Sequence, residues 1–326
     1  EAEEMRQLTP TDRIGRRLAS VIGDDASGID AERLYILDVE LWHPGSRPMA
    51  KQILREIEQV VAYGRLDGER VRDHFLGDLY CLARVSVKGV KLRRLLEMQT
   101  VAEVDLPPAP SINASVVARA TSRSFPTPPT PVEDGPRLCI LDSGVATNHP
   151  LLVNNIGDAV AVMTDDDRPA DLTGHGTKVA GIAIYGDVKA AFDAGTFSSP
   201  ITLFSARVLN SAGRFDDEKL LITQVRTAIE KFAAPPYDCR VFNLSVGSDL
   251  PAIFDSDGRQ SQWAEDLDTL ARELQVLIVL AAGNHKLDEA TTSEEAELVL
   301  DGYPEFLFEQ GATLSDPATA AIAITV

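Results

Sequence analysis

Short apolar segments that alternate with helix-like stretches constrain the fold of residues 137–326 more than any other feature of the sequence. The strand-like segments share a continuous apolar character and lie at residues 138–141, 201–208, 241–244 and 276–282. Helix-like stretches at residues 217–232 and 260–274 precede the last two of them. Strands that are apolar on both faces and are connected through helices predict a parallel sheet with helices on both sides. We therefore expect an α/β domain, over residues 137–326, whose functional residues lie beyond the carboxyl ends of the strands.

A smaller pattern of strands and helices precedes this domain, at residues 31–106. Its strand-like segments lie at residues 34–41, 69–76, 80–87 and 100–105, and its helix-like stretches begin at residues 46 and 90. The apolar residues of the first helix share one face: Met49, Ile53, Ile57, Val60 and Val61. The order β-α-β-β-α-β predicts a ferredoxin-like α+β domain. Residues 1–30 form a polar N-terminal segment, with a short helix expected near residues 14–22.

A proline-rich stretch separates the two patterns. Residues 107–136 combine many prolines with alanine, serine and threonine. Proline lacks a backbone N–H and fixes its own backbone angle, so it interrupts both helices and sheets. We expect this stretch to be an extended linker without sheet or helix, and it marks the domain boundary.

Charge and cysteine content exclude several classes of function. The formal net charge is -19, which disfavours nucleic acid or an anionic membrane surface as a partner, because both attract basic patches. We found no apolar run that approaches the length of a membrane span. The three cysteines, Cys81, Cys139 and Cys239, lie far apart without a CxxC pair. We therefore expect neither a zinc site nor a disulfide framework, and no nucleic-acid or membrane partner.

The N-terminus carries no pattern typical of a secretion signal. We accordingly expect a cytoplasmic rather than a secreted protein. Glu1 is not an initiator methionine, however, which leaves room for a removed upstream segment and keeps the location open.

An acid and a base occur where such a sheet would place functional groups. Asp142-Ser143-Gly144 follows the first strand directly, so the carboxylate should lie at the carboxyl edge. His175 stands between two glycines just before a helix of small and apolar residues, with Thr173 as the expected N-cap. Histidine exchanges a proton near neutral pH and is the usual general base in catalysis. Either motif alone is also common in turns and helix starts.

Two further strands end in polar or small residues. The third strand runs into Ser245-Val246-Gly247, and the fourth runs through Ala281-Ala282-Gly283 into Asn284. Strand and helix ends would thus bring an acid, a base, an amide donor and an edge of small residues toward one crevice.

These motifs, in this order, resemble those of the subtilisin-like serine proteases (subtilases, peptidase family S8). Residues 138–151 are similar to the catalytic-aspartate segment, and Gly174-His175-Gly176-Thr177 to the catalytic-histidine segment. The resemblance implies a subtilisin-like fold, with Asp142 and His175 as members of a catalytic triad and Asn284 as the oxyanion donor. It also implies that the substrate binds along Ser245, Val246 and Gly247. The substrate would be a protein or peptide, and no cofactor or metal would be needed.

The resemblance extends, with less specific motifs, to the first domain. Its topology and the segment at residues 101–107 resemble the propeptide domain that assists folding and inhibits the enzyme. That domain would then be an intramolecular partner of the catalytic domain.

The sequence departs from the family pattern at several positions. Lys178 stands where the family often has a second histidine, and His285-Lys286 follows Asn284 where small residues are usual. The acidic stretch at residues 288–309 is typical of a solvated insertion, so no calcium site is carried over. Residues 165–167 are three consecutive aspartates, which could hold a metal but favour a solvated loop.

The largest departure is the nucleophile. The family places it in a Gly-Thr-Ser segment downstream of the oxyanion asparagine, and residues 285–326 contain no such segment. Their two serines, Ser293 and Ser315, lack the start of a helix that the nucleophile needs. We therefore expect a chain that is truncated before its catalytic serine, which would lie beyond Val326, and that is inactive by itself.

Three functions compete on these observations. A serine endopeptidase is favoured, with a pseudoprotease that binds peptides or a partner as the alternative. A nucleotide-binding α/β domain fits poorly, because the glycines around His175 do not complete a GxGxxG motif and no Walker sequence is present.

Overall fold

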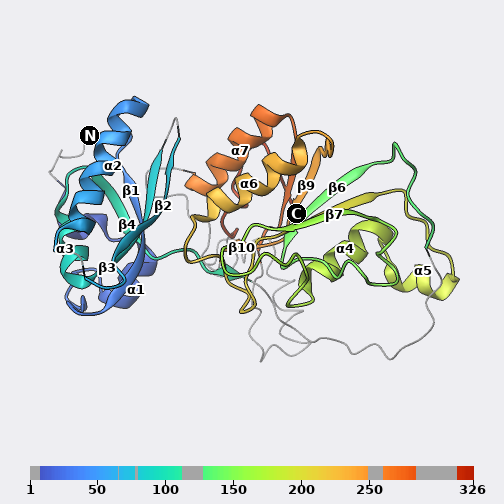
Figure 1. Ribbon diagram of the computed structural model, residues 1–326, viewed down its shortest axis with the longest axis horizontal. Helices are drawn as coiled ribbons and strands as arrows, with labels where there is room; N and C mark the ends of the chain where they lie inside the picture. Colours follow the sequence, from blue (N-terminus) through green and yellow to red (C-terminus); the bar gives the residue numbers. More distant parts are fainter. Residues whose placement is uncertain (1–7, 65, 78–79, 112–127, 249–259, 284–313) are drawn as a thin grey trace, which may run out of the picture. The chain divides into compact units, whose positions relative to one another are not determined.

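Figure 1 shows the computed structural model of the chain, which describes residues 8–64, 66–77, 80–111, 128–248, 260–283 and 314–326. The chain divides into two compact units. The first comprises Glu1–Pro107 together with Asp217–Thr223, and the second comprises Pro108–Asp216 and Gln224–Val326. Within the described residues, every helix is too short or too polar to span a lipid bilayer.

The first unit has the predicted order of elements. They are η1 (Pro10–Arg13), α1 (Arg16–Ile22), β1 (Leu34–Leu41), α2 (Arg47–Ala62), β2 (Arg70–Leu76), β3 (Cys81–Lys88), α3 (Gly89–Glu97) and β4 (Val101–Asp105). The four strands form one sheet in the order β2-β3-β1-β4, in which β1 pairs antiparallel with β3 and β4. A small α+β domain with an antiparallel sheet therefore precedes the second unit in the chain, as the predicted fold class requires.

The core of the first unit lies between this sheet and its helices. Alternate residues of β1 are buried, as a half-covered strand requires. On α2 the buried residues are Ala50, Leu54, Ile57 and Val61, whereas Met49 is 54% exposed. The predicted apolar face is thus correct at Ile57 and Val61, and Ile53 and Val60 pack against the core as partly buried residues, so that only Met49 departs from it. Leu18 and Ile22 of α1 join the same core.

The second unit is the predicted α/β domain. Its elements are β5 (Pro110–Ser111), β6 (Arg137–Asp142), β7 (Ile156–Ala161), α4 (His175–Tyr185), α5 (Val188–Ala194), β8 (Thr202–Arg207), α6 (Leu221–Ala233), β9 (Val241–Leu244), β10 (Gly247–Ser248), α7 (Gln262–Leu274), β11 (Leu277–Leu280) and β12 (Ile324–Thr325), although the first turn of α6 is assigned to the first unit. The sequence predicted β6, β8, β9 and β11, but not β7 or α5.

A parallel sheet forms the centre of this unit. Its strand order is β12-β11-β9-β6-β8-β7, and every pairing in it is parallel. Helices α6 and α7 lie on one face and α4 lies on the other (Figure 1). Residues 139–142 of β6 are fully buried, because the strand is flanked by β8 and β9 and covered on both faces. All carboxyl ends therefore meet at one edge of the sheet.

One short strand corrects the prediction for the proline-rich stretch. Pro110–Ser111 forms β5, which pairs antiparallel with β10, with Ser111 opposite Gly247 and Pro110 opposite Ser248. The prediction that residues 107–136 form no sheet is wrong at these two residues. Proline is tolerated in an edge strand because it lacks only the N–H donor, while its carbonyl can still accept a hydrogen bond.

Candidate active site

Asp142 ends the central strand β6 and is completely buried. Its Oδ1 accepts a hydrogen bond from the backbone N–H of Ser143 at 2.6 Å. Both of its oxygens face Nδ1 of His175, at 2.8 Å and 2.9 Å. A buried carboxylate needs such donors to remain charged, and here the strand end fixes the direction in which it accepts them.

His175 is the first residue of helix α4, and its side chain is 28% exposed. Because a carboxylate can only accept, the imidazole carries its proton on Nδ1 and leaves Nε2 as an acceptor when it is neutral. The hydrogen bond to Asp142 raises the pKa of His175, the charge of Asp142 adds to the increase, and burial opposes it. The ring can therefore take up a proton at Nε2 while Asp142 holds its other side.

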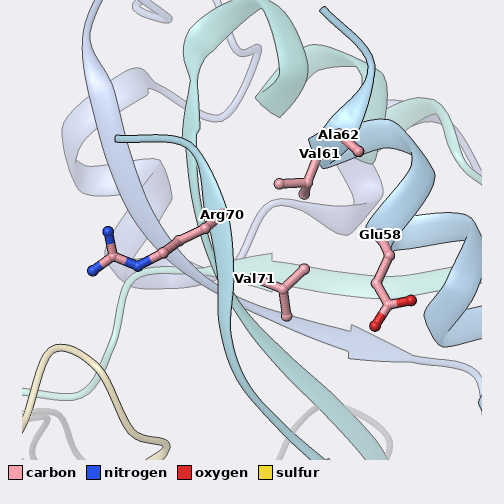
Figure 2. Close-up of a pocket in the computed structure, with 5 residues that line it drawn as sticks. All are labelled: Glu58, Val61, Ala62, Arg70 and Val71. Carbon is pink, nitrogen blue, oxygen red and sulfur yellow. The ribbon is translucent and has the colours of Figure 1, made fainter. Parts of the chain in front are cut away.

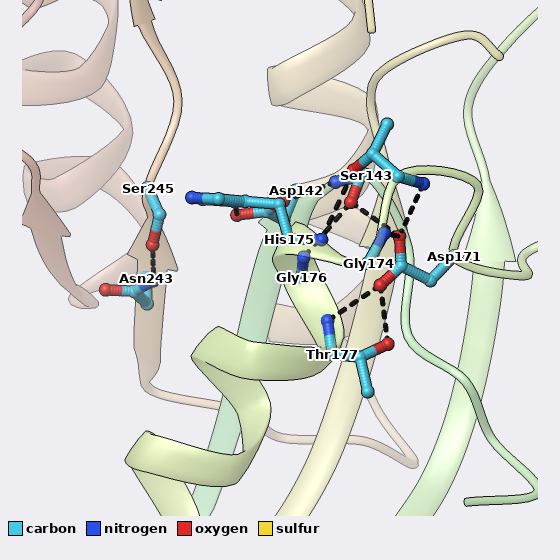
Figure 3. Close-up of polar contacts among 10 residues, drawn as sticks. Asp142, Ser143, Asp171, Gly174, His175, Gly176, Thr177, Asn243 and Ser245 are labelled. Atoms are coloured by element: carbon cyan, nitrogen blue, oxygen red, sulfur yellow. Dashed lines mark hydrogen bonds and ion pairs between the residues drawn. The ribbon is translucent and has the colours of Figure 1, made fainter. Parts of the chain in front are cut away.

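Three side chains satisfy the backbone amides at the start of α4, and Figure 3 shows two of them, Ser143 and Asp171. The N–H of His175 donates to Oγ1 of Thr173 at 3.3 Å, that of Gly176 to Oγ of Ser143 at 3.0 Å, and that of Thr177 to Oδ2 of Asp171 at 2.9 Å. These amides have no partner inside the helix. The N-cap residue is Gly174 rather than the predicted Thr173.

Glycines allow the helix to approach the turn after β6. A Cβ atom on Gly176 would lie 2.1 Å from the carbonyl oxygen of Gly144, and Gly144 itself has a φ of +96°. Only glycine combines that backbone conformation with such close contacts. The contact between Asp142 and His175 therefore depends on both glycines.

The predicted substrate edge lies at the same end of the sheet. Strand β9 pairs with β6 so that Leu244 lies opposite Leu141, which places Ser245 at the level of Asp142. The imidazole of His175 extends from α4 toward the strand end that carries Asn243 and Ser245 (Figure 3), and Nδ2 of Asn243 donates to Oγ of Ser245. Val246 is buried, and Gly247 is paired with β5.

The fourth strand end is described as far as Gly283. Strand β11 pairs with β9, and the N–H of Ala281 donates to the carbonyl of Leu244 at 3.3 Å. Asn284, the predicted oxyanion donor, lies outside the described residues, as do residues 288–309. The structure thus brings Asp142 and His175 into contact and places Ser245 on the neighbouring strand end.

Ser315 lies at this edge as well, a position that the sequence does not reveal. Its N–H donates to the carbonyl of Ala282 at 2.8 Å, and a Cβ built on Gly283 would lie 2.2 Å from its Oγ. A Cβ built on Gly247 would lie 3.7 Å from the Cβ of Ser315. Ser315 therefore lies between the ends of β10 and β11. Asp171 is the other residue that the sequence analysis missed.

The three consecutive aspartates form a loop held by arginines. The guanidinium of Arg168 binds Asp166 at 2.8 Å, and this contact lowers the pKa of Asp166 to about 2. Arg207, which is completely buried, donates to the backbone carbonyls of Asp166 and Arg168. In the described part of the chain, no three His, Cys, Asp or Glu residues are grouped so that they could hold a metal ion.

A hollow in the first unit offers no comparable set of groups. Its volume is about 370 Å³, and it lies between α2 and β2, lined by Glu58, Val61, Ala62, Arg70 and Val71 (Figure 2). The guanidinium of Arg70 points away from Glu58 and binds Glu218 at 2.6 Å. The hollow is thus left with one acid among aliphatic side chains.

Comparison with known sequences assigns each unit separately. The model of the subtilase family matches residues 133–326. The model described as the Y4kK central domain matches residues 12–106. The contact between Asp142 and His175 lies entirely within the first of these matches.

Individual relatives match parts of the chain. The uncharacterized protein y4kK of Sinorhizobium fredii (strain NBRC 101917 / NGR234) is 30% identical over 150 residues, which cover 46% of this chain and 47% of that protein. Thermitase of Thermoactinomyces vulgaris is 33% identical over 79 residues, which cover 24% of this chain and 28% of that protein. The chain therefore spans less than half the length of these curated relatives.

Solved structures that match part of the chain include a cold adapted subtilisin-like serine proteinase. It is 22% identical, with a TM-score of 0.36, over 59% of this chain and 54% of that one. A second is the CspB protease of Clostridium perfringens, at 20% identity and a TM-score of 0.35 over 47% and 36% of the two chains. Since the subtilase model covers more than half of residues 1–326, this chain belongs to the subtilase family.

Proposed function

We propose that the chain supplies the acid and the base of a serine endopeptidase, with Asp142 and His175 as two members of an Asp-His-Ser triad. The observation that carries the proposal is the contact of Nδ1 of His175 with both carboxylate oxygens of Asp142, at the edge where the strands end. We infer that the serine belongs to a Gly-Thr-Ser segment outside residues 1–326. We use the term complete protein for this chain together with its natural continuation through that segment.

The arrangement suggests how each group would act. Nε2 of His175 would take the proton of the serine hydroxyl as its oxygen attacks the peptide carbonyl, and would return that proton to the leaving amine. Asp142 would hold the Nδ1 proton and stabilise the imidazolium that forms. Asn284 would donate to the oxyanion, and Ser245, Val246 and Gly247 would align the substrate.

The pairing of β5 with β10 supports two further proposals. Pro110–Ser111 already lies as an extended strand along Gly247–Ser248, so this edge accepts a peptide backbone. We propose that the first unit is propeptide-like and that the segment following it in the chain, Pro110–Ser111, occupies the substrate edge. The same observation favours the alternative function, a pseudoprotease that binds extended peptides without cutting them.

Replacing the base tests the endopeptidase. In the complete protein, His175→Ala should nearly abolish casein cleavage, because the serine hydroxyl loses its base. His149→Ala is the matched control: this half-buried histidine lies in the loop after β6, where Nδ1 accepts the N–H of Leu151 at 3.3 Å. It should keep activity within about tenfold of the parent, because His149 supplies neither the proposed base nor its carboxylate.

Two outcomes separate the candidate functions. A folded His175→Ala protein that cleaves casein within tenfold of the parent would show that the mechanism is wrong. A complete protein that binds peptides but neither cleaves casein nor reacts with a fluorophosphonate serine probe would instead favour the pseudoprotease. Residues 1–326 alone should show no labelling by that probe.

A further inference from the structure

Asp171 accepts hydrogen bonds from four residues around the start of α4. Its Oδ1 accepts from Oγ of Ser143 at 2.8 Å and from the N–H groups of Thr173 and Gly174 at 3.0 Å and 2.8 Å. Its Oδ2 accepts from the N–H and Oγ1 of Thr177 at 2.9 Å and 2.5 Å. Every partner is a donor, so the site suits an ionised carboxylate, which only accepts.

Two hydroxyl groups extend these contacts to the turn after β6. Oγ of Ser143 donates to Asp171 and accepts from the N–H of Gly176 at 3.0 Å. Oγ1 of Thr177 donates to Asp171 and accepts from the N–H of Ala146 at 3.0 Å. Ser143 follows the acid directly in the chain, and Gly176 follows the base. The carboxylate of Asp171 therefore joins the two segments on which Asp142 and His175 stand (Figure 3).

We propose that Asp171 is a positioning residue of the Asp142–His175 pair, whose carboxylate ties the turn after β6 to the first turn of α4 and so fixes the imidazole against Asp142. It acts through Ser143, Gly174 and Thr177, and not on the reacting atoms. Its meaning for catalysis rests on the proposed function. The link itself does not, because it is a property of residues 1–326 that can be measured without turnover.

The charge of Asp171 also acts on His175. The groups that shift the pKa of His175 are Asp142 on β6 and Asp171, which raise it, and Lys178 on α4, which lowers it, while burial lowers it as well. Removing the charge of Asp171 should therefore lower the pKa of His175. Loosening the link should lower the pKa of His175 further, because the hydrogen bond to Asp142 is the largest contribution that raises it.

Three variants separate the link from general stability. Asp171→Asn keeps the shape of the side chain but removes its charge and half of its acceptors. Ser143→Ala keeps the charge and removes one hydroxyl of the link. Asp268→Asn is the control: this carboxylate also accepts two backbone amides, those of Ala321 and Ile322 at 2.8 Å and 2.7 Å, but on helix α7.

The first measurement is an NMR titration of the histidine rings in residues 1–326, with the His175 signal assigned by His175→Gln. We expect a lower His175 pKa in Asp171→Asn than in the parent, a smaller decrease in Ser143→Ala, and the parent value in Asp268→Asn. A folded Asp171→Asn chain with the parent pKa would overturn the proposal. Should Asp171→Asn fail to fold, an unchanged pKa in Ser143→Ala would overturn it equally.

The second measurement uses the complete protein. Asp171→Asn should lower kcat by about 10- to 100-fold with KM within about threefold, since misplacing a catalytic group by an ångström costs that much. The acid limb of its kcat/KM profile should move to lower pH, because activity requires neutral His175. Combining it with Ser143→Ala should cost little more than Asp171→Asn alone, since both break one link.

The two measurements distinguish failure of the proposed function from failure of the positioning role. If the parent complete protein is inactive while Asp171→Asn still lowers the His175 pKa in residues 1–326, the proposed function is wrong and the positioning role of Asp171 stands. If the parent is active and Asp171→Asn leaves kcat and the acid limb unchanged, the positioning role is wrong and the proposed function stands.

Discussion

Asp142 and His175 differ in exposure in a way that suits their chemistry. Asp142 is completely buried, whereas 28% of the His175 side chain is exposed. Burial removes competing water from the carboxylate and keeps its orientation fixed, while exposure leaves the ring open to an incoming group. The same pairing raises the pKa of His175, so the neutral base becomes available only as the pH rises through that increased value.

Asp142→Asn should disable the complete protein without unfolding it. An asparagine can donate from Nδ2 to Nδ1 of His175, which moves the ring proton to Nε2 and removes the acceptor that the serine needs. We expect kcat to fall by about 10⁴-fold, the scale known for loss of the triad carboxylate in another serine protease. Casein cleavage and circular dichroism measure the two effects. A folded variant with kcat within tenfold of the parent would contradict the assignment of Asp142.

At this scale the sequence predicts residues whose type and place are both distinctive. Asp142 follows an apolar strand and His175 stands between glycines, and the two side chains are in contact. Asp171 was missed because a capping carboxylate four residues before a histidine looks like any aspartate in a polar loop. The position of Ser315 was not predicted because it depends on contacts with Gly247 and Gly283, which are distant in sequence.

Among the elements, α4 depends on glycine at one position and merely tolerates it at another. Gly176 faces the turn after β6, where a Cβ would lie 2.1 Å from the carbonyl oxygen of Gly144. Gly181 lies farther along the same helix, where a Cβ would meet only Cγ2 of Val188, at 3.8 Å. Substituting Gly176 therefore tests close packing of the helix, whereas substituting Gly181 tests helix propensity.

Gly176→Ala and Gly181→Ala should shift stability in opposite directions. Gly176→Ala should destabilise residues 1–326 by about 1–3 kcal/mol through overpacking, and should weaken the contact of His175 with Asp142. Gly181→Ala should stabilise the chain by about 0.5–1 kcal/mol, because alanine restricts the unfolded chain and favours the helix. Urea denaturation followed by circular dichroism gives both values. Equal effects of the two substitutions would show that close packing at Gly176 is unimportant.

The elements that the sequence failed to predict lack a hydrophobic pattern. In β7, Gly157 and Asp158 interrupt the apolar residues, and the strand forms because it pairs with β8 along the sheet edge. Strand β5 consists of a proline and a serine, and its pairing with β10 is a long-range contact that local preferences do not encode. The strands with continuous apolar runs, such as β6 and β9, were predicted because burial on both faces dictates their composition.

For the molecule as a whole, the position of β5 predicts a masked substrate edge. Pro110–Ser111 would compete with substrate for Gly247–Ser248. To test this, the recognition site of a specific protease is inserted within residues 112–127 of the complete protein. Cutting that site after folding should lower KM. The physical reason is that a cut strand can leave the edge, whereas a tethered one returns at high effective concentration. The control is the same insertion left uncut. A KM that is identical before and after cutting would exclude the masking role.

The order of the strands along the chain also sets the order in which the parts of the site are synthesised. Strand β6 is the first strand of its sheet to leave the ribosome, and its neighbours β8 and β9 follow later in the chain. Asp142 and His175 are both made before β8, whereas β9 and β11 begin only at residues 241 and 277. At about 5–20 residues per second, the acid and base therefore leave the ribosome seconds before the proposed substrate edge is made. On the proposed function, the catalytic serine is synthesised later still, so a nascent chain gains its nucleophile last.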